Sequence, residues 1–170
     1  LASMWPGTVH GAEVLETNES ALAELPARPA VLHVASHAIA DDRDPYASHI
    51  SLAPDSLADG LLHGAEIGLL DLDGSLVVLS ACETVEGPLH AGEGLLGLQR
   101  SFAATGASGV LATLWPVGPS AAALVGFFYE SLVEGDPPVT ALHRAQLRML
   151  ENPETEHPFH WAGFVLQQPR

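Results

Sequence analysis

The chain has 170 residues, of which 47% are hydrophobic and only 16% are charged, a composition typical of one packed globular domain. It has 21 acidic residues against six basic ones, all of them arginine, and its formal net charge is −15 at pH 7. A surface this negative repels nucleic-acid phosphates and anionic lipids. This excludes nucleic-acid and membrane-surface roles and favours a neutral or basic partner, such as a peptide.

The cysteine count and the apolar runs narrow the class further. Cys82 is the single cysteine, which excludes an intrachain disulfide and a zinc site built from several cysteines. No apolar run reaches the roughly 18 residues of a membrane span, and no signal-peptide pattern opens the chain. We therefore expect a cytoplasmic protein. Because the sequence begins at Leu1 rather than Met, we expect residues 1–170 to be a single domain excised from the C-terminal part of a longer polypeptide.

Four short runs rich in valine and leucine predict buried strands. They lack the polar–apolar alternation of a half-exposed strand, as strands do when both faces of a parallel sheet are covered. The runs are residues 30–35, 75–80, 109–114 and 163–166.

Segments with helical spacing of apolar residues lie between these runs. Gly106 and Gly135 stand where helix C-caps belong, and Ser120 stands at a plausible N-cap. The predicted helices are residues 18–25, 63–70, 93–105, 120–134 and 139–150. Because strands and helices alternate, the sequence predicts an α/β fold with an open, mostly parallel sheet and helices on both faces.

Two of the predicted strand ends carry a histidine and the cysteine. Ligands of open parallel sheets bind beyond the carboxyl ends of the strands. His37 follows the first predicted strand and Cys82 follows the second. If these strands are neighbours, the two residues lie on one edge of the sheet. A thiol and an imidazole there are the parts of a cysteine nucleophile with a proton-transfer partner.

Five motifs in this order resemble the CHAT domain family of caspase-like cysteine peptidases. The resemblance runs from about residue 30 to residue 166, and its length and order make it specific. The motifs lie at residues 33–37, 79–84, 92–98, 112–117 and 157–166. In bacteria such domains often follow tetratricopeptide repeats, so the resemblance implies a bacterial protein with a regulatory domain of that kind in the same or a partner chain.

The resemblance also implies roles for individual residues. His37 matches the catalytic histidine and Cys82 the nucleophile, and no cofactor or metal is needed. The backbone N–H groups of Cys82 and Ala38 match the oxyanion donors, although the family usually has glycine where Ala38 stands. The residues expected to line the substrate groove are Ser80, Glu83 and Trp115. In relatives the sulfur and the imidazole are held apart, so a separation beyond hydrogen-bond reach is expected here.

Other interpretations of these residues stay open at this point. Cys82 as a buried structural thiol is the common fate of a free cysteine. His33 is expected to be a hydrogen-bonded structural histidine, because His33 and His37 lie about 13 Å apart on an extended strand, too far to share a metal ion. His157 and His160 are the best remaining metal ligands, but no clustered acid supports them.

Three activities fit the pattern in decreasing order. The first is an endopeptidase that cleaves a protein substrate through a Cys82–His37 dyad and an acyl-enzyme intermediate. The second is a catalytically silent CHAT module that acts as an interaction domain. The third is a small-molecule acyltransferase that uses the same cysteine, for which the sequence shows no phosphate-binding glycine-rich loop.

Overall fold

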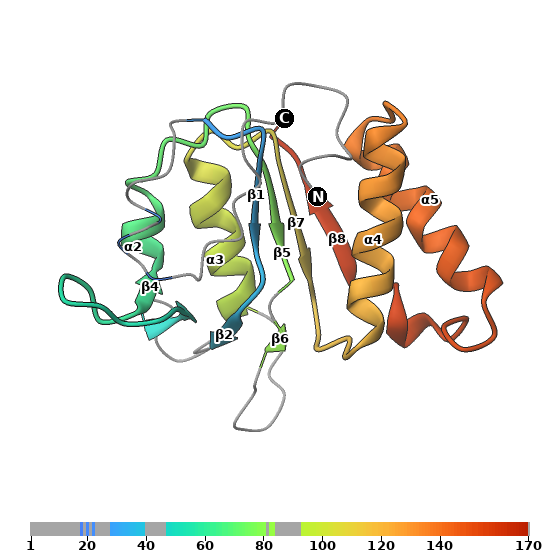
Figure 1. Ribbon diagram of the computed structural model, residues 1–170, viewed down its shortest axis with the longest axis horizontal. Coiled ribbons are helices and arrows are strands. Elements are labelled where there is room, and N and C mark those ends of the chain that lie inside the picture. Colours follow the sequence, from blue (N-terminus) through green and yellow to red (C-terminus); the bar gives the residue numbers. More distant parts are fainter. Residues whose placement is uncertain are drawn as a thin grey trace.

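The computed structural model describes residues 18, 20, 22, 28–39, 47–80, 82–83 and 93–169, with the backbone alone for 82–83 and 93–96. Its strands form two four-stranded sheets, and helices lie on both sides of the larger one (Figure 1). The strands are β1 (Val31–Val34), β2 (His37–Ile39), β3 (His49–Ser51), β4 (Leu61–His63), β5 (Leu76–Leu79), β6 (Cys82–Glu83), β7 (Gly109–Thr113) and β8 (Phe164–Gln167). The helices are α2 (Gly64–Ile67), α3 (Glu93–Ala104), α4 (Ser120–Val133), α5 (Pro138–Glu151) and the short 3₁₀ helix η2 (Pro158–His160).

The main sheet has the strand order β1-β5-β7-β8. β1, β5 and β7 are parallel, and β8 runs antiparallel to β7 at one edge. Its four strands coincide with the four apolar runs of the sequence, so that prediction is confirmed. Every residue of β5 and β7 is buried. Burial on both faces explains why these strands show no polar–apolar alternation.

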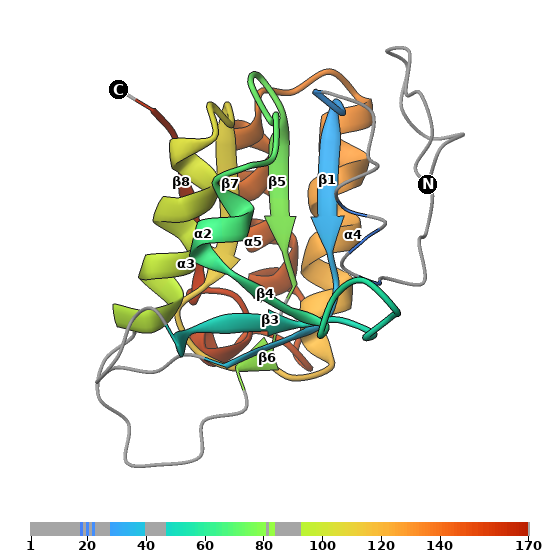
Figure 2. The same cartoon turned by 90° about the vertical axis from the view of Figure 1, so that its left-hand side faces the viewer.

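Alternate residues of the main sheet pack into two separate cores. On β5, Val77 and Leu79 belong to the core that includes Phe102 of α3, whereas Leu76 and Val78 belong to the core under α4 and α5. Figure 2 shows α2 and α3 in front of the sheet and α4 and α5 behind it. The expected α/β architecture with helices on both faces is therefore present.

The helices agree with the sequence over most of their length. Gly106 and Gly135 follow α3 and α4 with positive φ values of 88° and 95°, as expected of C-terminal glycines. Ser120 is not an N-cap, because Pro119 takes that position and the Ser120 hydroxyl donates to the carbonyl oxygen of Val117 instead. Helix α2 is shorter than predicted because His63 belongs to β4. The predicted helix over 18–25 lies almost wholly outside the described residues.

The second sheet, with the order β4-β3-β2-β6, is the part of the fold that the sequence did not predict. Its strands have only two or three residues, which is too short for a hydrophobic period to stand out. The central residues of the three longer strands, Ala38, Ile50 and Leu62, are at most 2% exposed and pack into the core beside α3. The second sheet is thus anchored to the main one through shared apolar burial.

Candidate active site

Two neighbouring strands of the main sheet continue into the second sheet at their carboxyl ends. β1 is followed by β2 and β5 by β6, and each pair is parallel in its own sheet. In the second sheet His37 lies opposite Cys82, and Ala38 lies opposite Glu83. The offset is unchanged from the main sheet, where Val34 lies opposite Leu79. The fold therefore brings His37 and Cys82 onto adjacent strands, about 4.8 Å apart at the backbone.

His37 and Cys82 are described to different depths. The side chain of His37 is exposed to solvent, at the edge of the molecule where β2 and β6 lie (Figures 1 and 2). The side chains of Cys82 and Glu83 lie outside the described residues. The expected separation between the sulfur and the imidazole, and the place of Glu83 in the groove, therefore stay predictions.

Ala38, which stands where the family usually has glycine, is an extended residue of β2. It is 1% exposed and lies between β3 and β6, opposite Ile50 on one side and Glu83 on the other. Extended backbone is open to any residue, so the methyl group of Ala38 costs no backbone strain here. The side chain instead contributes to the core that anchors the second sheet.

Ser80 and His33 form a side-chain pair just before the strands enter the second sheet. The Ser80 hydroxyl lies 2.7 Å from Nε2 of His33. The His33 ring is half-buried against Tyr129 of α4, with ring centroids 5.7 Å apart, and burial lowers the pKa of His33. The prediction that His33 is a hydrogen-bonded structural histidine is confirmed. Its partner was not predicted, because no sequence period connects residues 47 positions apart on different strands.

Trp115 is held in place by the segment that precedes β8. Its indole Nε1–H donates to the carbonyl oxygen of Phe159 at 3.0 Å, and its ring lies against Gly163. The residue is half-buried at the margin of the core under α4 and α5. Because the indole N–H is already paired, only the ring surface of Trp115 is left to contact a peptide.

A histidine and a serine that the sequence analysis did not connect also meet after β7. The Ser120 hydroxyl gives its one hydrogen to Val117, so it accepts from Nδ1 of His160 at 2.9 Å. His157 accepts from the backbone N–H of Phe159 at 3.2 Å. Within the residues that the structure describes, no group of three or more histidine, cysteine or acidic side chains could hold a metal ion. Both histidines therefore have structural partners.

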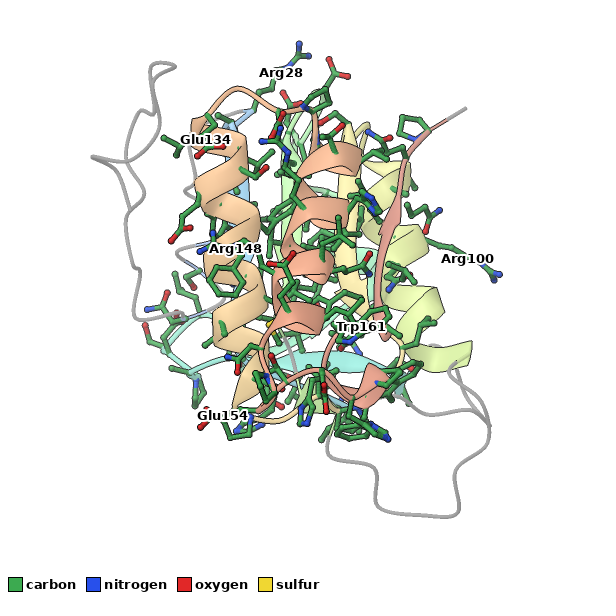
Figure 3. The ribbon with its side chains drawn as sticks, turned by 90° about the vertical axis from the view of Figure 1, so that its right-hand side faces the viewer. Arg28, Arg100, Glu134, Arg148, Glu154 and Trp161 are labelled. Carbon is green, nitrogen blue, oxygen red and sulfur yellow. The ribbon has the colours of Figure 1, made fainter. Side chains whose placement is uncertain are left out.

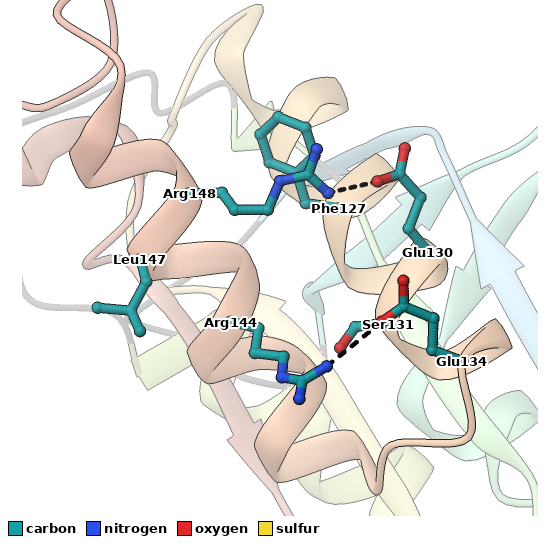
Figure 4. Close-up of a pocket in the computed structure, with 7 residues that line it drawn as sticks. All are labelled: Phe127, Glu130, Ser131, Glu134, Arg144, Leu147 and Arg148. Carbon is teal, nitrogen blue, oxygen red and sulfur yellow. Dashed lines mark hydrogen bonds and ion pairs between the residues drawn. The ribbon is translucent and has the colours of Figure 1, made fainter.

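A hollow of about 360 Å³ lies between α4 and α5, on a different face from His37 (Figures 3 and 4). Its two arginines are paired: Arg144 contacts Asp136 at 2.7 Å, and Arg148 contacts Glu130 and stacks on the ring of Phe127. Exposed ion pairs of this kind contribute little to stability. With its positive charges neutralised by neighbouring carboxylates, the hollow offers no charged site for an anion.

The comparisons with known proteins agree with this arrangement. The sequence matches the CHAT domain family over residues 6–168, nearly its whole length. The chain belongs to the CHAT domain family. Its caspase-like α/β fold is the one described above. No helix in the described part of the chain is long and apolar enough to cross a membrane.

Two mammalian proteins share a large part of the sequence. Tetratricopeptide repeat protein 28 of Mus musculus is 39% identical over 111 residues, and its counterpart in Homo sapiens is 36% identical over the same length. The matched segment covers 65% of this chain but only 4% of each relative. A CHAT domain similar to this one thus occurs in much longer proteins named for their tetratricopeptide repeats.

The contact between Trp115 and Gly163 can be tested by adding one methyl group. A Cβ at position 163 would lie 2.7 Å from Cε2 of Trp115, so Gly163→Ala should lower the free energy of unfolding by about 1–3 kcal/mol through overpacking. Gly126→Ala is the matched control, because a Cβ there meets nothing within 4 Å on helix α4. It should stabilise the protein by about 0.5–1 kcal/mol. Equal effects of the two changes in urea denaturation would contradict this account.

The lowered pKa of His33 predicts a loss of stability in acid. The unfolded chain binds a proton at this residue near pH 6.5, whereas burial keeps the folded residue neutral to lower pH. Stability should therefore fall as the pH drops from about 6.5 toward the lowered folded pKa. Replacing the imidazole in His33→Gln should flatten this part of the curve, measured by urea denaturation between pH 7.5 and pH 5. An unchanged slope would show that His33 does not titrate differently in the two states.

Proposed function

We propose that this CHAT domain is a cysteine endopeptidase with Cys82 as nucleophile and His37 as general acid and base. The observation that carries the proposal is the β2–β6 register, in which His37 lies directly opposite Cys82. The family match supports the same pair, because both residues stand in the motifs by which the sequence resembles caspase-like peptidases.

The chemistry follows from these two groups. The Cys82 thiolate attacks the carbonyl carbon of the scissile peptide bond, and the backbone N–H groups of Cys82 and Ala38 stabilise the oxyanion. His37 gives a proton to the departing amine, which leaves an acyl-enzyme thioester. His37 then takes a proton from water, which attacks the thioester and releases the acid product and the thiol. No cofactor takes part in this scheme.

The proposed substrate groove is formed by Ser80, Glu83 and Trp115. Ser80 is half-buried, and its hydroxyl is paired with His33, whose pKa is lowered by burial. A hydroxyl backed by a neutral imidazole gives no charge to pair with a basic or acidic substrate side chain, and burying an unpaired charge is costly. We therefore propose that the residue before the cut is uncharged.

The second candidate is a silent CHAT module that serves as an interaction domain. The curated relatives favour it, because their names refer to tetratricopeptide repeats and to no peptidase activity. In either case we propose that a repeat domain in the same or a partner chain controls the CHAT domain. The two candidates differ in the reactivity of Cys82. A catalytic thiolate reacts with iodoacetamide at pH 6–7 well ahead of a free thiol, whose pKa is about 8.5.

The dyad can be tested by single substitutions. Cys82→Ala and His37→Ala should each abolish peptide cleavage and leave the free energy of unfolding nearly unchanged, because members of one catalytic unit fail together. His143→Ala is the matched control, since His143 is also exposed but lies on α5. It should cleave at the wild-type rate. Full activity in a folded Cys82→Ala protein would refute the peptidase proposal.

The proposed pocket can be tested with a peptide library. The wild-type protein should select uncharged side chains immediately before the cut. Ser80→Asp should shift the preference toward arginine and lysine, because the new carboxylate can pair with a buried cation. Strong selection for basic residues by the wild-type protein would instead assign the pocket to other acidic groups.

A further inference from the structure

The placement of His37 opposite Cys82 depends on the register between β1 and β5. The two segments are bonded in the main sheet up to the contact from the backbone N–H of Ser80 to the carbonyl oxygen of Val34, 3.0 Å long. They pair again in the second sheet at His37 and Cys82, with the same offset. A slip by one residue in the main sheet would carry Cys82 past His37, since the linking segments have only one or two residues.

The apolar residues of these strands do not by themselves fix that register. β1 and β5 consist largely of valine and leucine, side chains of similar shape that can pack in more than one pairing. The pair formed by His33 and Ser80, called the register contact below, is different. The neighbours of Ser80 are Leu79 and Ala81, whose side chains have no polar atom, so the bond from His33 forms in one register only.

The surroundings of the register contact favour its formation. His33 packs against Tyr129 and is kept neutral by burial, and Ser80 is half-buried. A hydroxyl both donates and accepts, so the pair forms with either tautomer of the neutral ring. In a half-buried position, a partner left without its hydrogen bond regains little from water. The contact thus penalises any other pairing of the two strands.

We propose that the His33–Ser80 contact sets the register of β1 against β5 and so positions Cys82 opposite His37. His33 is then a positioning residue for the dyad, and Ser80 serves this role besides its place in the proposed groove. The inference deepens the proposed function and rests on it for its kinetic consequence. Its structural consequence, the pairing of β2 with β6, can be measured without any substrate.

The first measurement is hydrogen exchange over residues 37–39 and 82–83 in the full 170-residue chain. His33→Leu removes the polar atom, and we expect exchange in these segments to become at least about tenfold faster while β7 and β8 keep their protection. His33→Gln keeps a side-chain amide that can reach Ser80, and Ser80→Thr keeps the hydroxyl, so both should restore much of the protection. Tyr129→Phe is the matched control, because it keeps the ring against His33 and removes only the Tyr129 hydroxyl.

The second measurement is peptide cleavage per titrated active site. His33→Leu should lower kcat at least about tenfold with KM within about twofold, and adding Ser80→Ala to it should cause little further loss, since both changes break one contact. Tyr129→Phe should keep the wild-type kcat. Loss of folding stability alone would leave kcat per active site unchanged and would overturn the proposal.

The two measurements separate the two proposals. If the wild-type protein cleaves no peptide but His33→Leu loosens residues 82–83, the peptidase function fails and the register contact stands. If cleavage requires Cys82 and His37 but His33→Leu retains kcat within about twofold and normal exchange, the register contact is refuted and the peptidase function stands.

Discussion

The parallel pairing of β1 with β5 is the constraint on which the candidate site depends. Both strands leave the main sheet at the same edge, and both enter the second sheet with their relative offset unchanged. A pair of residues set far apart in the chain is thereby brought onto adjacent strands without any contact of its own. The precision of the candidate dyad is inherited from the sheet beneath it.

The two cores keep that sheet in place. α3 covers one face with Phe102, and α4 covers the other with Phe128, both of them completely buried. Because β5 and β7 are buried on both sides, the strands can neither twist freely nor shift toward solvent. The carboxyl edge is then the part of the sheet that is left open for chemistry, as is usual for parallel sheets.

Polar contacts, rather than apolar ones, provide the specific pairings at this edge. Ser80 with His33, Trp115 with Phe159, and Ser120 with His160 each join segments that are distant in sequence. Hydrogen bonds have directions and fixed lengths, whereas leucine and valine pack in several ways. The edge that carries His37 is therefore ordered by a few directional contacts laid over a non-directional core.

The sequence by itself determined the α/β class, the four strands of the main sheet and the helices α3, α4 and α5. Long apolar runs and helix-terminating glycines are local signals that survive in one dimension. It also marked His37 and Cys82, through motifs shared with the CHAT family.

Only the tertiary structure decided what those residues meet. The strands of the second sheet are too short to carry a period, and the bond between His33 and Ser80 joins residues that no local rule connects. The pairing of β2 with β6 likewise follows from how the main sheet aligns β1 with β5. Contacts between distant segments depend on the register of whole strands, which is a property of the packed molecule and not of any one stretch of sequence.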